Sequence, residues 1–144
     1  MFGLKARFQA TVEEIAAADA WVDEIGRSLG IADRTTFGAR VCIAEIAANV
    51  LEHGASPCEA VEFGVTLGRR ESGLDIEITD SGPQFDPTAV SERPLPSSLD
   101  EAEIGGVGLR LVRSYASDIT YRRDGLCNRL KLHIPASPSS GTAP

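Results

Sequence analysis

Two polar side chains interrupt an apolar run in the first half of the chain. Glu45 and Asn49 stand four residues apart within Ile43–Leu51 (IAEIAANVL). In a helix this spacing places both side chains on one stripe, one turn apart. A carboxylate can accept a proton, and an amide oxygen can ligate a hard cation such as Mg²⁺ without adding charge. The same pair also fits the polar edge of an amphipathic helix, so it does not define a site by itself.

A second candidate stands at the end of an alternating run, Leu74–Thr79 (LDIEIT). Asp80 follows this run, and Gly82 follows Asp80 in a turn-forming segment. An aspartate at a strand end can accept a hydrogen bond from an exocyclic amine, such as the one that adenine carries. A simple turn explains the two residues equally well.

The third candidate is the glycine cluster Gly105–Leu109 (GGVGL), which directly precedes a predicted helix. Clustered glycines let backbone N–H groups approach a phosphate, and a helix N-terminus adds a favourable dipole. The segment matches neither a P-loop nor a dinucleotide-binding fingerprint. A hinge fits the glycines as well, and Arg110 and Arg113 fit either phosphate contacts or solvated surface charges.

Hydrophobic periodicity predicts the elements that would carry these residues. A capping box, Thr11 with Glu14, starts the first helix, which ends before Gly30. Asp33 caps a second helix that ends at Gly54. Its buried stripe is predicted to be Phe37, Val41, Ala44, Ala48 and Leu51. The complete order is a strand at 4–10, the two helices, a hairpin of 59–68 and 73–79, a long loop at 81–105, a helix at 106–116, and strands at 118–123 and 128–134.

This order predicts an α+β fold in which helices cover one face of a mixed, mostly antiparallel sheet. We expect one domain over residues 1–134 and a disordered tail over 135–144, because the tail is rich in Ser, Pro and Gly and has nothing to bury. A length of 144 residues with 42% apolar and 24% charged residues also fits one globular domain.

Composition and charge exclude several classes of protein. The net charge of −7 argues against a sequence-independent nucleic-acid binder, which needs a basic surface. No run of about 18 apolar residues predicts a membrane span, and the first residues lack the apolar stretch of a signal peptide. Three cysteines without a CxxC spacing indicate a reduced, cytoplasmic setting, and two histidines without clustered thiols argue against structural zinc.

Together the three candidates form a specific pattern. Glu-x-x-x-Asn-x-x-x-His-Gly at 45–54 precedes Asp-x-Gly at 80–82, and Gly-Gly-x-Gly-Leu at 105–109 follows. This order resembles the GHKL superfamily of ATP-binding proteins over residues 5–134. Within it, the chain is similar to the anti-sigma-factor serine/threonine kinases, which phosphorylate STAS-domain antagonists in bacterial partner switching. We expect no phosphoacceptor helix upstream and a short lid, from about Thr88 to Ile104.

The resemblance implies a two-layer α/β sandwich of the Bergerat type that binds ATP and Mg²⁺. Asn49 would hold Mg²⁺, Asp80 would receive the adenine amine, and Gly82 would let the base approach. Glu45 would be the general base for a serine hydroxyl. Backbone groups of the glycine segment would bind the phosphates, at Gly105, Gly106, Val107, Gly108 and Leu109.

Three features depart from the family pattern. Gln84, preceded by Pro83, stands where relatives often have a second glycine, which stiffens the first hinge of the lid. Gly125–Arg129 (GLCNR) lacks a threonine that relatives often carry there, so a phosphate contact from this segment stays open. No lysine stands near the glycines, so Mg²⁺, backbone amides and Arg110 would neutralise the phosphate charge.

Three functions therefore compete. In the first, the chain is a kinase with a STAS-domain antagonist as substrate and a sigma factor as partner. In the alternative, it is a non-catalytic ATP-binding module that sequesters a regulator, and turnover of ATP with a STAS partner would separate the two. The third is an ATPase related to histidine kinases, which a phosphohistidine would favour. The family resemblance also implies a homodimer, for which the first strand and helix are candidate contact surfaces.

Overall fold

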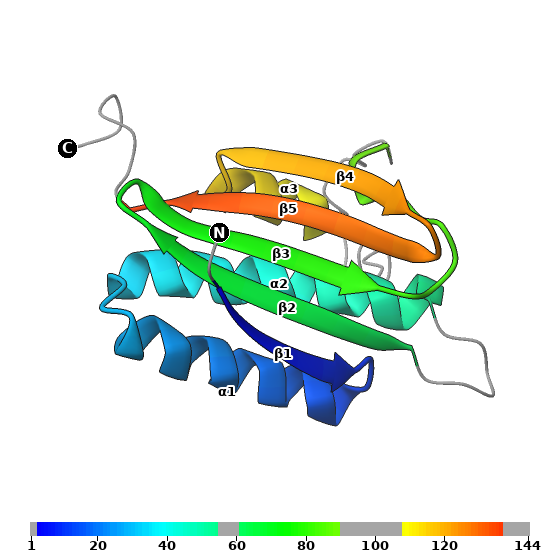
Figure 1. The fold of residues 1–144 in the computed structure, drawn as a ribbon, viewed down its shortest axis with the longest axis horizontal. Coiled ribbons are helices and arrows are strands. Elements are labelled where there is room, and N and C mark those ends of the chain that lie inside the picture. The colour runs from blue at the N-terminus through cyan, green and yellow to red at the C-terminus, as the bar shows by residue number, and fades with distance from the viewer. Residues whose placement is uncertain (1–2, 55–60, 90–107, 137–144) are drawn as a thin grey trace, which may run out of the picture.

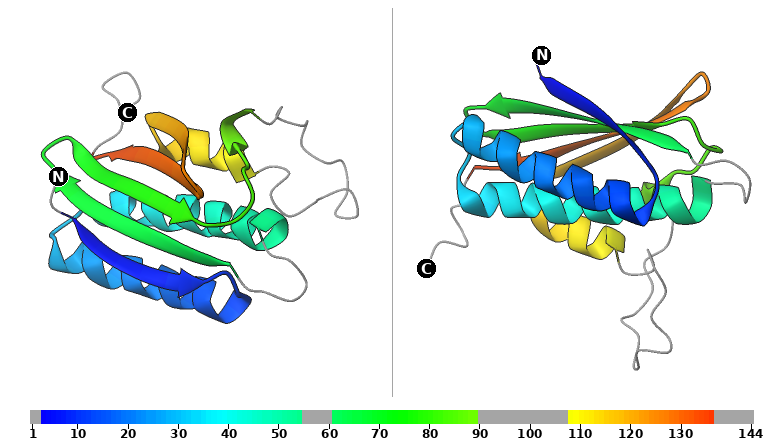
Figure 2. Two further views of the ribbon diagram at one scale, coloured as in Figure 1. Left: turned by 45° about the vertical axis from the view of Figure 1, so that its right-hand side comes forward. Right: turned by 90° about the horizontal axis from the view of Figure 1, so that it is seen from below.

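The computed structural model describes residues 3–54, 61–89 and 108–136. These residues form two layers: a five-stranded sheet with the strand order β1-β2-β3-β5-β4, and helices that all cover one of its faces (Figures 1 and 2). In chain order the elements are β1 (Leu4–Gln9), α1 (Val12–Ser28), α2 (Asp33–Gly54), β2 (Glu62–Arg70), β3 (Gly73–Asp80), the 3₁₀ turn η1 (Pro87–Ala89), α3 (Gly108–Tyr115), β4 (Asp118–Asp124) and β5 (Cys127–Pro135).

The predicted α+β sandwich and its element order are confirmed. We expected a mixed sheet, but every described strand pair is antiparallel, including β3 with β5. The sheet also extends beyond the expected domain end at 134. Pro135 is the last residue of β5, and the Ala136 N–H donates to the Ser72 carbonyl at 2.8 Å. Residues 137–144 of the expected tail lie outside the described residues.

Both ends of α1 follow the sequence signals. The Glu14 N–H donates to Thr11 Oγ1 at 3.1 Å, as a capping box requires. The Glu14 carboxylate reaches back past Thr11, however, and accepts from the Gln9 N–H at 3.2 Å. After the helix, Gly30 has a φ of +70°, and the Ile31 N–H closes the end on the Gly26 carbonyl at 2.9 Å.

The buried face of α2 differs from the predicted stripe. The side chains that are buried belong to the neighbouring positions: Thr35, Thr36, Ala39, Cys42, Ile43, Ile46, Ala47, Asn49 and Val50. Phe37, which was predicted to be buried, is 52% exposed and packs edge to face on Tyr115 of α3, with ring centroids 6.0 Å apart. The stripe was wrong because α2 packs against the sheet, α1 and α3, so apolar residues surround most of the helix.

One end of the inner sheet face is polar. Across β2, β3, β5 and β4, the side chains on this face form cross-strand rows. Two successive rows are mainly apolar, and the third is mainly polar. The first is Leu67, Ile76, Leu132 and Ile119; the second is Val65, Ile78, Leu130 and Tyr121; the third is Phe63, Asp80, Asn128 and Arg123. The third row lies where the arrowhead of β3 approaches the C-terminal end of α2 (Figure 1). It therefore brings polar side chains to the edge of the core.

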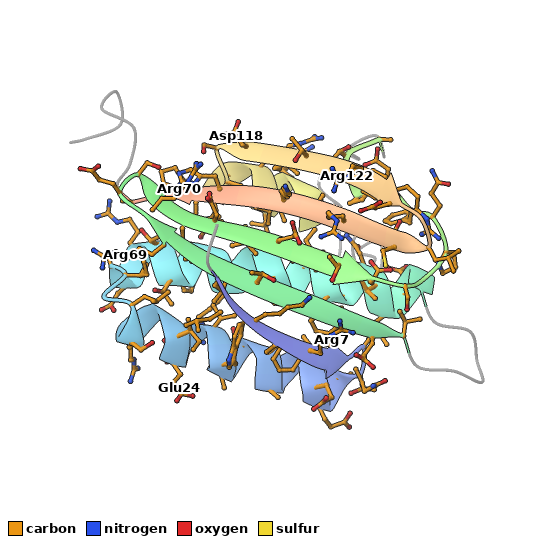
Figure 3. The ribbon with its side chains drawn as sticks, in the orientation of Figure 1. Arg7, Glu24, Arg69, Arg70, Asp118 and Arg122 are labelled. Carbon is orange, nitrogen blue, oxygen red and sulfur yellow. The ribbon has the colours of Figure 1, made fainter. Side chains whose placement is uncertain are left out.

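The outer sheet face carries paired charges, such as Arg129 with Glu77 and His133 with Asp75 (2.7 Å). Figure 3 shows this face with its polar side chains, and Arg7, Arg70 and Arg122 are labelled on its strands. Of the helices in the described part of the chain, none combines the length and hydropathy that a membrane span needs.

Gly26→Ala is expected to destabilise the fold by about 1–3 kcal/mol, the usual cost of an extra methyl group in a packed interface. A Cβ atom at Gly26 would lie 2.5 Å from Oγ1 and 2.7 Å from Cγ2 of Thr36, which belongs to α2. Urea unfolding measures the change. Since alanine favours a helix over glycine, the variant would be stabilised without this clash. Adding Thr36→Ala should therefore recover most of the loss, and a stabilised single variant would contradict the prediction.

Candidate functional site

A pocket lies between α2, the polar end of the sheet and the segment after β3. Its walls are mostly apolar: Ile46, Val50, Ile78, Pro83, Phe85, Pro87 and Leu130. Its polar groups are few: Asn49, Asp80, Tyr121 and Asn128. Apolar walls with a few convergent polar groups are typical of small-molecule sites. The cavity volume of about 30 Å³ is room for one or two water molecules and is smaller than a purine ring.

Asp80 contributes a carboxylate to this pocket, and hydrogen bonds hold one of its two oxygens. Its Oδ1 accepts from the Gly82 N–H at 2.9 Å and from Asn128 Nδ2 at 3.0 Å. No residue within the described ranges donates to Oδ2. The buried Gly82 therefore forms the turn that the sequence predicted, and one carboxylate oxygen remains available to a ligand.

Asn49 lines the same pocket from α2 and is only 6% exposed. Among the described residues, none hydrogen-bonds its side-chain amide. Its polar atoms are not completely enclosed, so water or a ligand in the pocket can hydrogen-bond the amide. The chemistry of this group fits a bound cation or polar ligand, and the fold brings it to the pocket that contains Asp80.

Glu45 lies one turn before Asn49 and is half-buried, but it is not part of the pocket wall. Its charge acts on Cys42, whose thiol is fully buried. Burial, together with a smaller effect of the Glu45 carboxylate, raises the pKa of Cys42 to about 12. Cys42 therefore stays a neutral thiol that packs in the core and contacts the Val112 carbonyl at 3.9 Å.

The predicted phosphate segment is only partly described. Gly105, Gly106 and Val107 lie outside the described residues, whereas Gly108 and Leu109 are the first two residues of α3. The helix thus starts within the predicted glycine cluster. Of the lid expected from Thr88 to Ile104, the structure describes Thr88 and Ala89 in η1, where Thr88 N–H donates to Asp86 Oδ1 at 2.8 Å. The rest of that lid is not described.

The sequence analysis missed Asn128 as a site residue, although the chain carried a signal for it. Asn128, Leu130, Leu132 and Ile134 alternate on one face of β5, and the last three are core residues. Strand periodicity therefore places Asn128 on the inner face, where an isolated amide needs a reason. Tyr121 and Arg123, on the same face of β4, both donate to its Oδ1.

Comparisons with known proteins show the family to which the chain is related. Residues 8–134 match the family model of the histidine kinase-like ATPase domain. The chain is 31% identical over 134 residues to serine/threonine-protein kinase BtrW of Bordetella bronchiseptica, across 92% of this chain and 94% of the relative. It is 21% identical over 120 residues to serine-protein kinase RsbW of Oceanobacillus iheyensis, across 81% of this chain and 76% of the relative.

A solved structure has the same fold. The crystal structure of the RsbU and RsbW domains of a Mycobacterium tuberculosis protein matches with a TM-score of 0.60 and 13% identity, over 94% of this chain and 32% of that chain. At this identity the likeness concerns the fold alone, and this chain spans about a third of that longer one. The match to the family model, by contrast, includes both Asn49 and Asp80. The chain therefore belongs to the family of histidine kinase-like ATPase domains, within the GHKL superfamily that its sequence pattern resembles.

Proposed function

We propose that the chain is a serine/threonine protein kinase of the anti-sigma-factor type. It would bind Mg-ATP and phosphorylate a STAS-domain antagonist, and so control the release of a sigma factor. The observation that carries this proposal is the convergence of Asn49 from α2 and Asp80 from β3 on one mostly apolar pocket. The names of two relatives, a serine/threonine-protein kinase and a serine-protein kinase, support it.

The base of the nucleotide would bind at Asp80. Its free Oδ2 can accept a hydrogen bond from the adenine amine, and the apolar walls can pack on the ring. Gly82 carries no side chain that would obstruct the base. Because the cavity is smaller than a purine, we expect binding to rotate Phe85, a half-buried side chain on the loop after β3.

The phosphates would lie between α2 and the start of α3. Bound Mg²⁺ would neutralise phosphate charge, and the Asn49 amide oxygen would be its ligand from the protein. Backbone N–H groups of the Gly105–Leu109 segment would bind phosphate oxygens beside the positive end of the α3 dipole. Asn49 and this segment therefore hold the triphosphate in line for transfer.

Glu45 would act as the general base. Its place one turn from Asn49, outside the pocket wall, suits a group that meets a protein substrate rather than the base of the nucleotide. The carboxylate would take the proton of the serine or threonine hydroxyl while that oxygen bonds to the γ-phosphorus. The bond from the γ-phosphorus to the bridging oxygen then breaks, and ADP leaves.

Transfer of labelled phosphate from γ-labelled Mg-ATP to a STAS-domain protein of the same organism tests the proposal on the full chain. We expect phosphoserine or phosphothreonine in the STAS protein and one ADP for each phosphate transferred. Binding of ATP without transfer would favour the alternative, a non-catalytic anti-sigma module. Phosphohistidine on this chain would favour an ATPase related to histidine kinases.

A further inference from the structure

The side chain of Asn128 is a buried hydrogen-bonding centre at the pocket. It is 6% exposed and belongs to the start of β5. Its amide nitrogen donates to Asp80 Oδ1 at 3.0 Å and to the Pro83 carbonyl at 2.8 Å. A primary amide has two N–H donors, so both are in use.

The amide oxygen of Asn128 is equally occupied. It accepts from the Phe85 N–H at 3.2 Å, the Tyr121 hydroxyl at 2.6 Å and Arg123 Nη1 at 3.1 Å. A flipped amide would set its N–H groups against these three donors, so the partners fix the orientation. With all its polar atoms engaged, Asn128 acts through the groups that it holds and not by touching a ligand.

Asp80 is the charged group that Asn128 holds. The two residues are register partners on β3 and β5, so the backbone of the sheet fixes their spacing. Since Oδ1 already accepts from Asn128 and Gly82, the carboxylate has one orientation, with Oδ2 left for a ligand. An ionised carboxylate only accepts hydrogen bonds. It attracts an amine on a base, whereas a carbonyl in the same place would set two acceptors against each other.

The loop after Asp80 is held by the same network. Asn128 fixes the backbone at Pro83 and Phe85, and Arg123 Nη1 donates to the Gly82 carbonyl at 2.9 Å. The backbone of residues 82–85 is thus tied to β4 and β5 by hydrogen bonds that need no nucleotide. Because this backbone is already ordered in the free protein, binding of a nucleotide costs less conformational entropy.

We propose that Asn128 is a positioning residue for base selection. By orienting Asp80 and tying down residues 82–85, it makes the pocket prefer a base with an exocyclic amine over one with a carbonyl in that position. The inference rests on the proposed function, because it takes the base to bind at Asp80. This gives Asn128 a role within Gly125–Arg129, the segment that lacks the threonine of the family pattern and for which the sequence left a phosphate contact open.

The affinities of the full chain for Mg-ATP and for the magnesium complex of inosine triphosphate test this role. Inosine carries a carbonyl where adenosine carries the amine. We expect the wild type to prefer ATP by about tenfold to 100-fold, the range of a hydrogen bond to a charged group. Asn128→Ala should lose at least about fivefold of this preference, mainly through weaker ATP binding. Asn128→Thr, which keeps one hydroxyl donor for Asp80, should keep part of it.

Thermal unfolding without nucleotide shows which variants fold, and the threonine variant is the test if the alanine variant does not. Gly26→Ala is the control for a general loss of stability, because Gly26 packs against Thr36 near the start of α2, whereas the pocket contains Asn49 near its end. The preference of this variant for ATP should equal that of the wild type. Equal weakening of both nucleotides in the Asn128 variants would overturn the inference and leave the proposed function standing. A wild type that binds neither nucleotide would overturn both.

Discussion

Glu45→Gln is expected to lower the rate of phosphoryl transfer to a STAS-domain substrate by about 10²–10⁴-fold, the usual contribution of a general base. The amide has nearly the shape of the carboxylate but does not accept the hydroxyl proton. Affinity for Mg-ATP should change little, because Glu45 is outside the wall of the nucleotide pocket. Single-turnover transfer with saturating ATP and substrate measures the chemical step directly.

Glu52→Gln is the matched control for this experiment. Glu52 lies two turns further along the same side of α2, and the substitution makes the same change in charge. We expect this variant to transfer phosphate at close to the wild-type rate. If Glu45→Gln also transfers at that rate, Glu45 is not the base. If both variants are impaired to the same degree, the effect comes from the charge of α2 and not from proton transfer.

The arrangement of elements could be predicted because each one has a strong local signal. Thr11 and Gly30 mark the ends of α1, and Gly125, with a φ of +64°, closes the β4–β5 hairpin where the sequence has Asp-Gly. These signals involve neighbouring residues, so tertiary contacts did not need to be known. The buried face of α2 was different, because α1, α3 and the sheet all contact that helix and the apolar pattern does not say which side of it faces the sheet.

The candidate site could be predicted in part for the same reason. Asn49 and Asp80 each break a regular apolar pattern, and the pocket contains both. The hydrogen bonds of Asn128 could not be derived, because they depend on the register between β3 and β5, strands joined through α3 and β4. Asn128 and Asp80 are 48 positions apart in the chain. Only the alternation along β5 indicated that Asn128 points inward.

Asp80→Asn and Asn49→Ala are expected to remove the stabilisation by Mg-ATP in different ways. A ligand at about 100 times its Kd adds about 2.7 kcal/mol to the stability of the wild type, which thermal unfolding detects easily. Asp80→Asn keeps an oxygen that can accept from Asn128 and Gly82, but its amide can set an N–H against the adenine amine. This variant should lose the shift with or without magnesium. Asn49→Ala should lose only the magnesium-dependent part of the shift. In the wild type, chelation of magnesium removes this same part.

Asp118→Asn, the same substitution at the exposed first residue of β4, should keep the full wild-type shift and so serves as the control. With EDTA present, the wild type and Asn49→Ala should give equal shifts, since the amide then has no metal to hold. A shift that survives Asp80→Asn would put the nucleotide somewhere other than this pocket. No shift in the wild type with Mg-ATP in large excess would mean that the chain keeps the ATPase fold without the ATP site. Its function would then have to come from the surfaces that bind other proteins.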